Sequence, residues 1–322
     1  MSFKDIQGQD RATSFLRGSI ESGRISHAYI FYGPYGIGKK LTAMNFAKAL
    51  NCSAANEAGG ASFAQSCDAC IPCRKIDSSN HPDVSVLRPE KEGGSISIDA
   101  VRALIKDASL KPYEAKKKVY IIDEADGMKE EASNAFLKTL EEPPSDSVFI
   151  LIAESLRRLP ATIVSRSQVV KFFPLRVDEV KDILIKLYGV DEPKAHVLSH
   201  LSAGRLGDAV KYADEAFLAK REKVIAALAD RTFFESDFDK LSKTDLKVYL
   251  AILLTWYRDI LVAKSGGPEV VNIDRKDVII AEAAKTGFDR LEQMIGQIIS
   301  TYSYVEQNAN PKLAMAALGM SA

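Results

Sequence analysis

The sequence lacks any apolar run that approaches the length of about 18 residues needed for a membrane-spanning helix. Its first residues do not follow the pattern of a secretory signal peptide, so we expect a cytoplasmic protein. An excess of charge is also missing, because 43 basic and 43 acidic residues give a formal net charge of zero. Strong binding of nucleic acid by overall charge is therefore not predicted, although local basic patches remain open.

The sequence has no internal repeat and no low-complexity tract. Its 322 residues are more than one typical core holds and suit two or three domains. Hydrophobic residues make up 46% and charged residues 27%, which is ordinary for a globular protein. Cysteine is scarce, with four residues in the whole chain, and all four fall within one stretch.

The four cysteines, Cys52, Cys67, Cys70 and Cys73, follow the pattern C-x14-C-x2-C-x2-C. Two-residue spacers bring sulfurs to one ion across a short turn, and four thiolates suit tetrahedral Zn²⁺. A site closed by four sulfurs has no open coordination position, so we expect a structural zinc that holds a loop-like insertion. The alternative is four reduced cysteines in a loop, since a reducing compartment does not favour disulfides.

The central motif is a glycine-rich stretch, Gly33-Pro34-Tyr35-Gly36-Ile37-Gly38-Lys39-Lys40. It lies between an apolar run at 28–32 and a helical pattern that extends to residue 50, which is the context of a phosphate-binding loop. The glycines let backbone N–H groups face phosphates, and the helix N-terminus adds the positive end of its dipole. ATP or ADP is therefore the candidate ligand of the loop, through Gly33, Gly36, Gly38, Lys39 and Lys40.

The residue after the loop lysine departs from this motif. That position normally carries a Ser or Thr whose hydroxyl binds Mg²⁺, whereas Lys40 offers no oxygen. Thr42 lies two residues further on and should point elsewhere on the helix. We therefore expect a nucleotide cradle with a damaged Mg²⁺ site.

Two carboxylates end the buried strand predicted for residues 119–122. In ATPases of this layout the first carboxylate, here Asp123, orders Mg²⁺ and its waters, and the second, here Glu124, polarises the attacking water. An Asp-Glu pair of this Walker B type is weak evidence alone, and it gains weight from the glycine loop upstream. The alternative is a solvated N-cap of the next helix.

Apolar runs alternate with helical patterns along the first half of the chain. The runs predict strands at 28–32, 84–87, 119–122, 148–153 and 169–172. Each run is nearly all apolar, which indicates an α/β fold with a parallel sheet covered on both faces. After Pro174 the pattern is helical, with short helices up to 212 and then a helical region suited to assembly.

Four stretches carry a family resemblance: Ile6-Gln7-Gly8-Gln9 through His27-Ala28-Tyr29, the four-cysteine insertion, Asn134 through Pro144, and Ser165-Arg166-Ser167. Together they resemble the AAA+ clamp-loader subunits of bacterial DNA polymerase III, over nearly the whole chain. The resemblance implies an AAA+ P-loop domain over 1–173 with a zinc module at 52–73. It also implies a small helical lid domain over 174–212 and an all-α collar domain for oligomerisation over 213–322.

Departures from gamma and tau, the motor subunits of that family, point to one of its branches. Lys40 replaces the threonine of the motors, and Gly207 stands where the second-sensor arginine is expected, with Arg205 displaced by two positions. Ser165-Arg166-Ser167 keeps the arginine that in this family reaches into the nucleotide site of a neighbouring subunit. The sequence is thus similar to the delta-prime branch, which implies an arginine finger in trans at Arg166 and little or no ATPase activity alone.

This resemblance also implies partners, namely gamma/tau and delta subunits in a hetero-pentamer, and the sliding clamp and primer–template DNA through that complex. Two other functions remain open. An ATP-hydrolysing motor like gamma or tau is consistent with Lys39, Asp123 and Glu124. A zinc-stabilised nucleic-acid-binding module is suggested by the cysteines, although the neutral charge and the lack of an aromatic-rich basic stripe speak against it.

Overall fold

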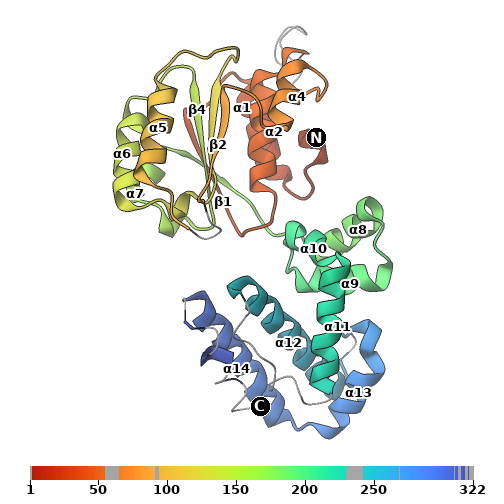
Figure 1. Ribbon diagram of the computed structural model, residues 1–322. Coiled ribbons are helices and arrows are strands. Elements are labelled where there is room, and N and C mark those ends of the chain that lie inside the picture. Colours follow the sequence, from red (N-terminus) through yellow and green to blue (C-terminus); the bar gives the residue numbers. More distant parts are fainter. Residues whose placement is uncertain are drawn as a thin grey trace. The chain divides into compact units, whose positions relative to one another are not determined.

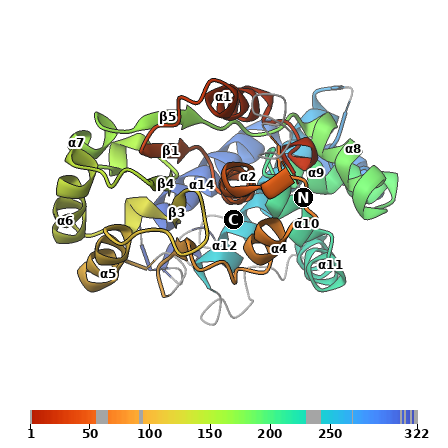
Figure 2. The same ribbon diagram turned by 90° about the horizontal axis from the view of Figure 1, so that it is seen from above.

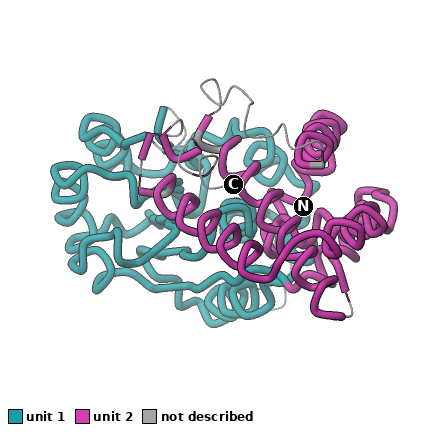
Figure 3. Tube along the Cα trace, turned by 90° about the horizontal axis from the view of Figure 1, so that it is seen from below, with its two compact units in different colours: residues 1–175 teal, residues 176–322 magenta. Residues whose placement is uncertain are grey.

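The computed structural model describes residues 2–54, 65–90, 94–229, 242–267, 269–307, 309–310, 313–315 and 318. The chain forms two compact units, Met1–Leu175 (unit 1) and Arg176–Ala322 (unit 2) (Figure 3). Residues 55–64 of the predicted zinc module and residues 230–241 of the predicted collar lie outside the described residues. Within the described ranges, no helix combines the length and the apolar character that crossing a bilayer requires.

Unit 1 is built on a five-stranded parallel sheet in the order β2-β3-β4-β1-β5. Its strands are β1 (Ala28–Tyr32), β2 (Val84–Leu87), β3 (Lys118–Ile122), β4 (Ser147–Ala153) and β5 (Gln168–Lys171). All five strands predicted from the apolar runs are present within a residue or so of the expected bounds. The parallel arrangement confirms the predicted α/β class.

Helices cover both faces of this sheet (Figures 1 and 2). One face carries α1 (Asp10–Glu21), α2 (Lys39–Asn51) and α4 (Ile71–Asp77), and the other carries α5 (Ile98–Ala108), α6 (Glu130–Glu141) and α7 (Ala161–Val164). Because successive strand residues point to opposite faces, Tyr29 and Phe31 pack with the first group, while Ala28 and Ile30 pack with the second. Burial on both sides explains why the strands are nearly all apolar.

The segments that matter for the site leave the sheet at its carboxyl edge. The glycine loop follows β1, Asp123 and Glu124 follow β3, and Glu154 follows β4. A short 3₁₀ turn follows each of β3 and β4. These turns are η2 (Ala125–Gly127) after β3 and η3 (Leu156–Arg158) after β4. Since β3, β4 and β1 are neighbours in the sheet, the predicted loop and carboxylates meet at one edge, where open α/β sheets bind ligands.

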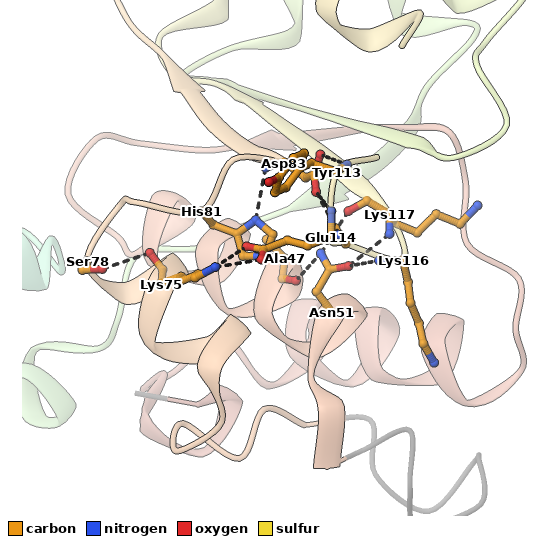
Figure 4. A network of polar contacts seen from close by, with 11 residues as sticks. Ala47, Asn51, Lys75, Ser78, His81, Asp83, Tyr113, Glu114, Lys116 and Lys117 are labelled. Atoms are coloured by element: carbon orange, nitrogen blue, oxygen red, sulfur yellow. Dashed lines mark hydrogen bonds and ion pairs between the residues drawn. The ribbon is translucent and has the colours of Figure 1, made fainter. Parts of the chain in front are cut away.

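Asn51, the last residue of α2, fixes the opposite end of β3 (Figure 4). Its side-chain oxygen accepts the backbone N–H groups of Lys116 and Lys117, each at 3.0 Å. Its amide nitrogen donates to the carbonyl of Lys117 at 3.0 Å. The amino end of β3 is therefore held to α2 by contacts that read only the backbone.

Asp83, in the turn before β2, holds the same segment from another side (Figure 4). Its buried carboxylate accepts three backbone N–H groups, each at 2.8 Å, those of Tyr113, Glu114 and Ala115. Burial raises the pKa of Asp83, but these donors outweigh burial and hold that pKa below its usual value. The segment before β3 is thus ordered by a buried carboxylate that stays ionised.

The regular elements that the structure describes in unit 2 are helices. Its helices are α8 (Val177–Tyr188), α9 (Glu192–Leu201), α10 (Leu206–Tyr212), α11 (Glu215–Ala229), α12 (Lys243–Lys264), α13 (Lys276–Lys285) and α14 (Phe288–Glu306), with a 3₁₀ turn at Ile273–Arg275. One core joins Trp256 of α12 and Met294 of α14 with Val197 of α9. The predicted helical character is confirmed, and the finer division between residues 212 and 213 stays a prediction.

Candidate functional site

The glycine loop between β1 and α2 has backbone angles that residues with a Cβ atom rarely adopt. Gly33, Gly36 and Gly38 have φ values of 147°, 76° and 92°. A Cβ atom at Gly33 would also lie 2.5 Å from the carbonyl oxygen of Phe172. Glycine is therefore required at Gly33 by conformation and by space, and the loop turns as tightly as its sequence indicated.

Lys39 begins α2, and its side chain turns back into the loop. Its Nζ donates to the carbonyls of Gly33 and Pro34 at 2.5 and 2.6 Å, and the residue is only 6% exposed. Burial lowers the pKa of Lys39, and three carboxylates oppose this shift, namely Glu154, Asp126 and Asp123. A phosphate bound here would replace two carbonyl contacts of an ammonium that is already largely desolvated.

Lys40 forms an ion pair with the first carboxylate after β3. Its Nζ lies 3.1 Å from Oδ2 of Asp123, and the two side chains are 44% and 19% exposed. The buried hydroxyl of Thr42 donates to the carbonyl of Gly38 at 2.9 Å, so it points away as predicted. In P-loop ATPases Mg²⁺ is held by the hydroxyl after the lysine and by this aspartate. The residues present here do not fit Mg²⁺.

Glu124, the second carboxylate, sits in a left-handed backbone conformation with φ 54° and ψ 44°. Residues other than glycine adopt this conformation uncommonly. Two further carboxylates at this edge, Asp126 and Glu154, lie 3.6 and 3.4 Å from Nη1 of Arg158. The sequence does not reveal this cluster, because Arg158 follows β4 and reaches Asp126 only through the order of the strands.

Arg166 lies in the turn after α7, where its side chain meets the end of α6. Nη2 of Arg166 is 2.8 Å from Oε1 of Glu141, and Nη1 donates to the carbonyl of Thr162 at 3.1 Å. The side chains of Arg166 and Glu141 are 37% and 52% exposed. An exposed ion pair contributes about 0–1 kcal/mol, so the guanidinium can exchange this partner for another anion.

Arg205 and Gly207 belong to unit 2, whereas the glycine loop belongs to unit 1. Arg205 precedes α10, and its Nε lies 2.9 Å from Oδ2 of Asp208 and donates to the carbonyl of Ser202 at 3.1 Å. Gly207 is the second residue of α10. The arginine is thus engaged within its own turn.

The sulfurs of the four cysteines converge on one point. All four Sγ atoms lie within 4.8 Å of one another, and those of Cys52 and Cys70 are 3.9 Å apart. A tetrahedral Zn²⁺ with Zn–S distances of about 2.3 Å separates its sulfurs by about 3.8 Å. Backbone N–H groups of Cys67 and Cys70 point at the sulfurs of Cys52 and Cys67, at 3.4 and 3.3 Å. Donor set and spacing therefore fit Zn²⁺.

The thiols of the cluster have unequal proton affinities. Burial raises the pKa of Cys70, but N–H donors from Cys73 and Ser53 outweigh it and lower that pKa to about 6. Burial raises the pKa of Cys73, and the sulfur of Cys70 raises it further. The Cys70 thiolate therefore forms readily and opposes ionisation of Cys73. A bound dication would offset the repulsion between the two thiolates.

A buried lysine connects the cysteine cluster to α2. The side chain of Lys48 is 1% exposed, and its Nζ lies 2.6 Å from Oδ1 of Asp68 and 2.9 Å from Oδ1 of Asp77. Asp68 stands between Cys67 and Cys70 in the chain, and Asp77 ends α4. A buried ammonium needs such partners, so this pairing fixes the cysteine-bearing turn against the helix. The sequence motifs do not single out Lys48.

The sequence matches two family models. Residues 8–176 match the family described as DNA polymerase III, delta subunit, and residues 215–318 match DNA polymerase III, delta subunit, C terminal. Among solved structures, a DNA polymerase III gamma subunit-related protein from Thermotoga maritima is 19% identical, with 96% of this chain and 97% of that one covered. Its TM-score of 0.43 is too low to bear on the fold.

Individual relatives agree with these families. The chain is 37% identical over 282 residues to DNA polymerase III subunit delta' of Bacillus subtilis, which covers 84% of this chain and 82% of that protein. It is 32% identical over 219 residues to subunit tau of the same organism, covering 66% of this chain and 37% of that protein. The chain therefore belongs to the delta-prime family of DNA polymerase III clamp-loader subunits, which is related to gamma and tau, as its motifs indicated.

Proposed function

We propose that the chain completes the nucleotide site of a neighbouring clamp-loader subunit with Arg166 and depends little on a nucleotide site of its own. One contrast carries the proposal: the ion pair of Arg166 with Glu141 is open to solvent, whereas Lys40 pairs with Asp123 where Mg²⁺ would be needed. In this role the subunit supports ATP-driven loading of the sliding clamp onto primed DNA, in the cytoplasm, together with gamma/tau and delta.

The surroundings of Arg166 support action in trans. Its partner Glu141 is a single exposed carboxylate, and a polyphosphate offers more charge and more oxygens to the planar guanidinium. An arginine supplied in this way stabilises the charge of the transition state and is worth about 10³–10⁵ in kcat in GTPases. Breaking the ion pair of Arg166 with Glu141 therefore costs little free energy, and a contact of Arg166 with a neighbour's phosphate would stabilise the transition state far more.

The assembly itself we assign to residues 213–322, because residues 215–318 match the C-terminal model of the family. Residues 174–212 would then form the lid, and residues 1–173 the AAA+ domain. We also propose that Cys52, Cys67, Cys70 and Cys73 bind one structural Zn²⁺, because their four sulfurs lie within 4.8 Å of one another.

A second candidate function is that of an ATP-hydrolysing motor. Lys39, Asp123 and Glu124 are all at the carboxyl edge of the sheet, and the chain shares 32% identity with tau over 219 residues. The pairing of Lys40 with Asp123 argues against this function, since hydrolysis by this class of site depends on Mg²⁺.

The deciding experiment compares ATP turnover in loaders reconstituted with motor subunits, delta, clamp and primed DNA. Each loader carries the wild-type chain, Arg166→Ala or Lys39→Ala, and Arg11→Ala, an exposed arginine of α1, serves as the matched control. We expect Arg166→Ala to lower turnover while Lys39→Ala and Arg11→Ala do not, with assembly checked by gel filtration.

Other outcomes separate the candidates. Loss of turnover with Lys39→Ala in an intact complex would favour the motor. Unchanged turnover with both variants would remove the support for the finger and for the motor. Tight, salt-sensitive DNA binding by the isolated chain would instead support a nucleic-acid-binding module.

A further inference from the structure

The pairing of Lys40 with Asp123 replaces a metal contact rather than merely removing one. We propose that the glycine loop binds a nucleoside diphosphate without any divalent cation, because the ammonium of Lys40 supplies the positive charge that Mg²⁺ supplies in other P-loop proteins. The proposal rests on the glycine loop being a phosphate cradle, as its sequence and backbone angles indicate, and it is independent of the role proposed for Arg166.

The position of Lys40 supports this substitution. In P-loop proteins the metal joins two elements, the first turn of the helix after the loop and the aspartate at the end of the Walker B strand. Lys40 is in the first turn of α2, and its Nζ reaches Oδ2 of Asp123 at the end of β3, 3.1 Å away. The lysine side chain therefore joins the same two elements that Mg²⁺ joins elsewhere.

The hydroxyl that binds Mg²⁺ in P-loop sites is missing here. Mg²⁺ requires near-octahedral oxygen ligands at about 2.1 Å. Lys40 has no oxygen, and the Thr42 hydroxyl is buried and donates to Gly38. Asp123 is already neutralised by an ammonium, which would repel a dication at the same carboxylate.

The parts of the cradle that contact phosphate directly are retained. Gly36 and Gly38 keep the positive φ values on which the tight loop depends, and α2 begins immediately after them. Lys40 is 44% exposed, and an ammonium has three N–H donors, so it can hold Asp123 and still donate to a phosphate oxygen.

The charges around the loop favour a diphosphate over a triphosphate. One ammonium carries half the charge of Mg²⁺, so the additional charge of ATP is compensated less well than that of ADP. The carboxylates of Glu154 and Asp126 act on Lys39, the residue that would reach the β- and γ-phosphates, and Arg158 neutralises them only in part. We therefore expect ADP to bind more tightly than ATP.

The test is a titration of the isolated full-length chain with a fluorescent ADP, in metal-free buffer and again with added MgCl₂. Chelators are avoided because they would also remove a metal held by the cysteines. Variants are Lys40→Thr, which restores the hydroxyl, and Lys40→Arg, which keeps a cation, and circular dichroism verifies that each is folded. ATP is titrated as the competing ligand.

For the wild type and for Lys40→Arg, we expect the affinity for ADP to be the same in metal-free buffer and in buffer with Mg²⁺. Lys40→Thr should bind more weakly in metal-free buffer and gain about tenfold or more in affinity with Mg²⁺, a change of about 1.4 kcal/mol. The wild-type titration is decisive by itself if a variant fails to fold.

Three results would overturn the inference: wild-type binding that requires Mg²⁺, no binding of ADP in either buffer, or a folded Lys40→Thr variant that ignores Mg²⁺. Turnover in the reconstituted loader is a separate measurement, and it tests the role of Arg166 whatever the titration shows. If Arg166→Ala lowers turnover there while the wild type fails to bind ADP, the inference fails and the proposed function stands.

Discussion

Helix α2 has a candidate cation site at each end, and the two sites are built in opposite ways. At the N-terminal end, Lys40 places its ammonium against one carboxylate, that of Asp123. At the C-terminal end, Cys52 begins a cluster of four converging thiols. One ammonium can balance one carboxylate, whereas four thiolates carry more charge than a single side chain can offset. The comparison shows how residue types decide whether a protein uses its own cation or binds one.

The strongest test of this comparison removes one thiol, with Cys73→Ser. Zinc binding in small modules contributes about 10–16 kcal/mol, so losing one of four ligands should abolish stoichiometric zinc and lower the thermal unfolding temperature markedly. Metal content by atomic emission and thermal unfolding by circular dichroism measure this. Lys40→Ala, a change at the other end of α2, should leave the zinc content unchanged. Wild-type protein purified without chelator that held no zinc and four free thiols would contradict the assignment.

A smaller effect is expected from Lys48→Met, which removes the cation between the two ends of α2. The variant removes the ammonium that Asp68 and Asp77 share, but both carboxylates are partly exposed, so we expect a loss of about 2 kcal/mol in the free energy of unfolding by urea. Lys75→Met provides the control, because the pair of Lys75 with Glu114 is exposed and should cost less than about 1 kcal/mol. Equal losses in the two variants would refute a special role for Lys48.

The same pair predicts a dependence on pH. Burial raises the pKa of Asp68, but hydrogen bonds from Lys48 and Ser66 outweigh burial and lower that pKa below its usual value. A carboxylate with a lowered pKa stabilises the fold above its unfolded-state pKa, and this contribution is lost as the pH falls through the lowered value. Urea unfolding at acidic pH should therefore narrow the difference between wild type and Lys48→Met, and a difference that widened in acid would contradict this.

The smallest effect concerns Arg166, a cation whose partner is exposed rather than fixed. Replacing Glu141 by Gln should free the guanidinium and raise ATP turnover of the reconstituted loader by at most about fivefold, since such a pair is worth no more than about 1 kcal/mol. Glu142→Gln is the matched control, because Glu142 is adjacent and exposed and forms no ion pair among the described residues. If the increase persisted in an Arg166→Ala background, Glu141 would act by another route.

The sequence predicted the strands, the glycine loop and the two carboxylates, and the order of the strands then brings loop and carboxylates to one edge of the sheet. Buried parallel strands are nearly all apolar, so their runs stand out, and the carboxyl ends of neighbouring parallel strands meet. The ion pairs could not be predicted in this way, because a sequence gives residue types but not distances. It showed that Lys40 lacks a hydroxyl, yet not that its ammonium reaches Asp123. For Lys48 there was a signal, a charged residue within the apolar stretch 46–50, and a buried lysine needs a carboxylate partner.

The network around Asp83 and Asn51 has a consequence for sequence tolerance. Both side chains bind backbone groups of residues 113–117, so they specify the path of the segment without specifying its side chains. Substitution of the exposed Tyr113 should therefore be tolerated, whereas Glu114 and Lys117 also form ion pairs through their side chains. Proline is the exception at each of these positions, because it has no N–H to donate. Tyr113 is 85% exposed, and its position could carry a fluorescent label on a segment whose backbone is held by hydrogen bonds, so that movements of this subunit could be followed.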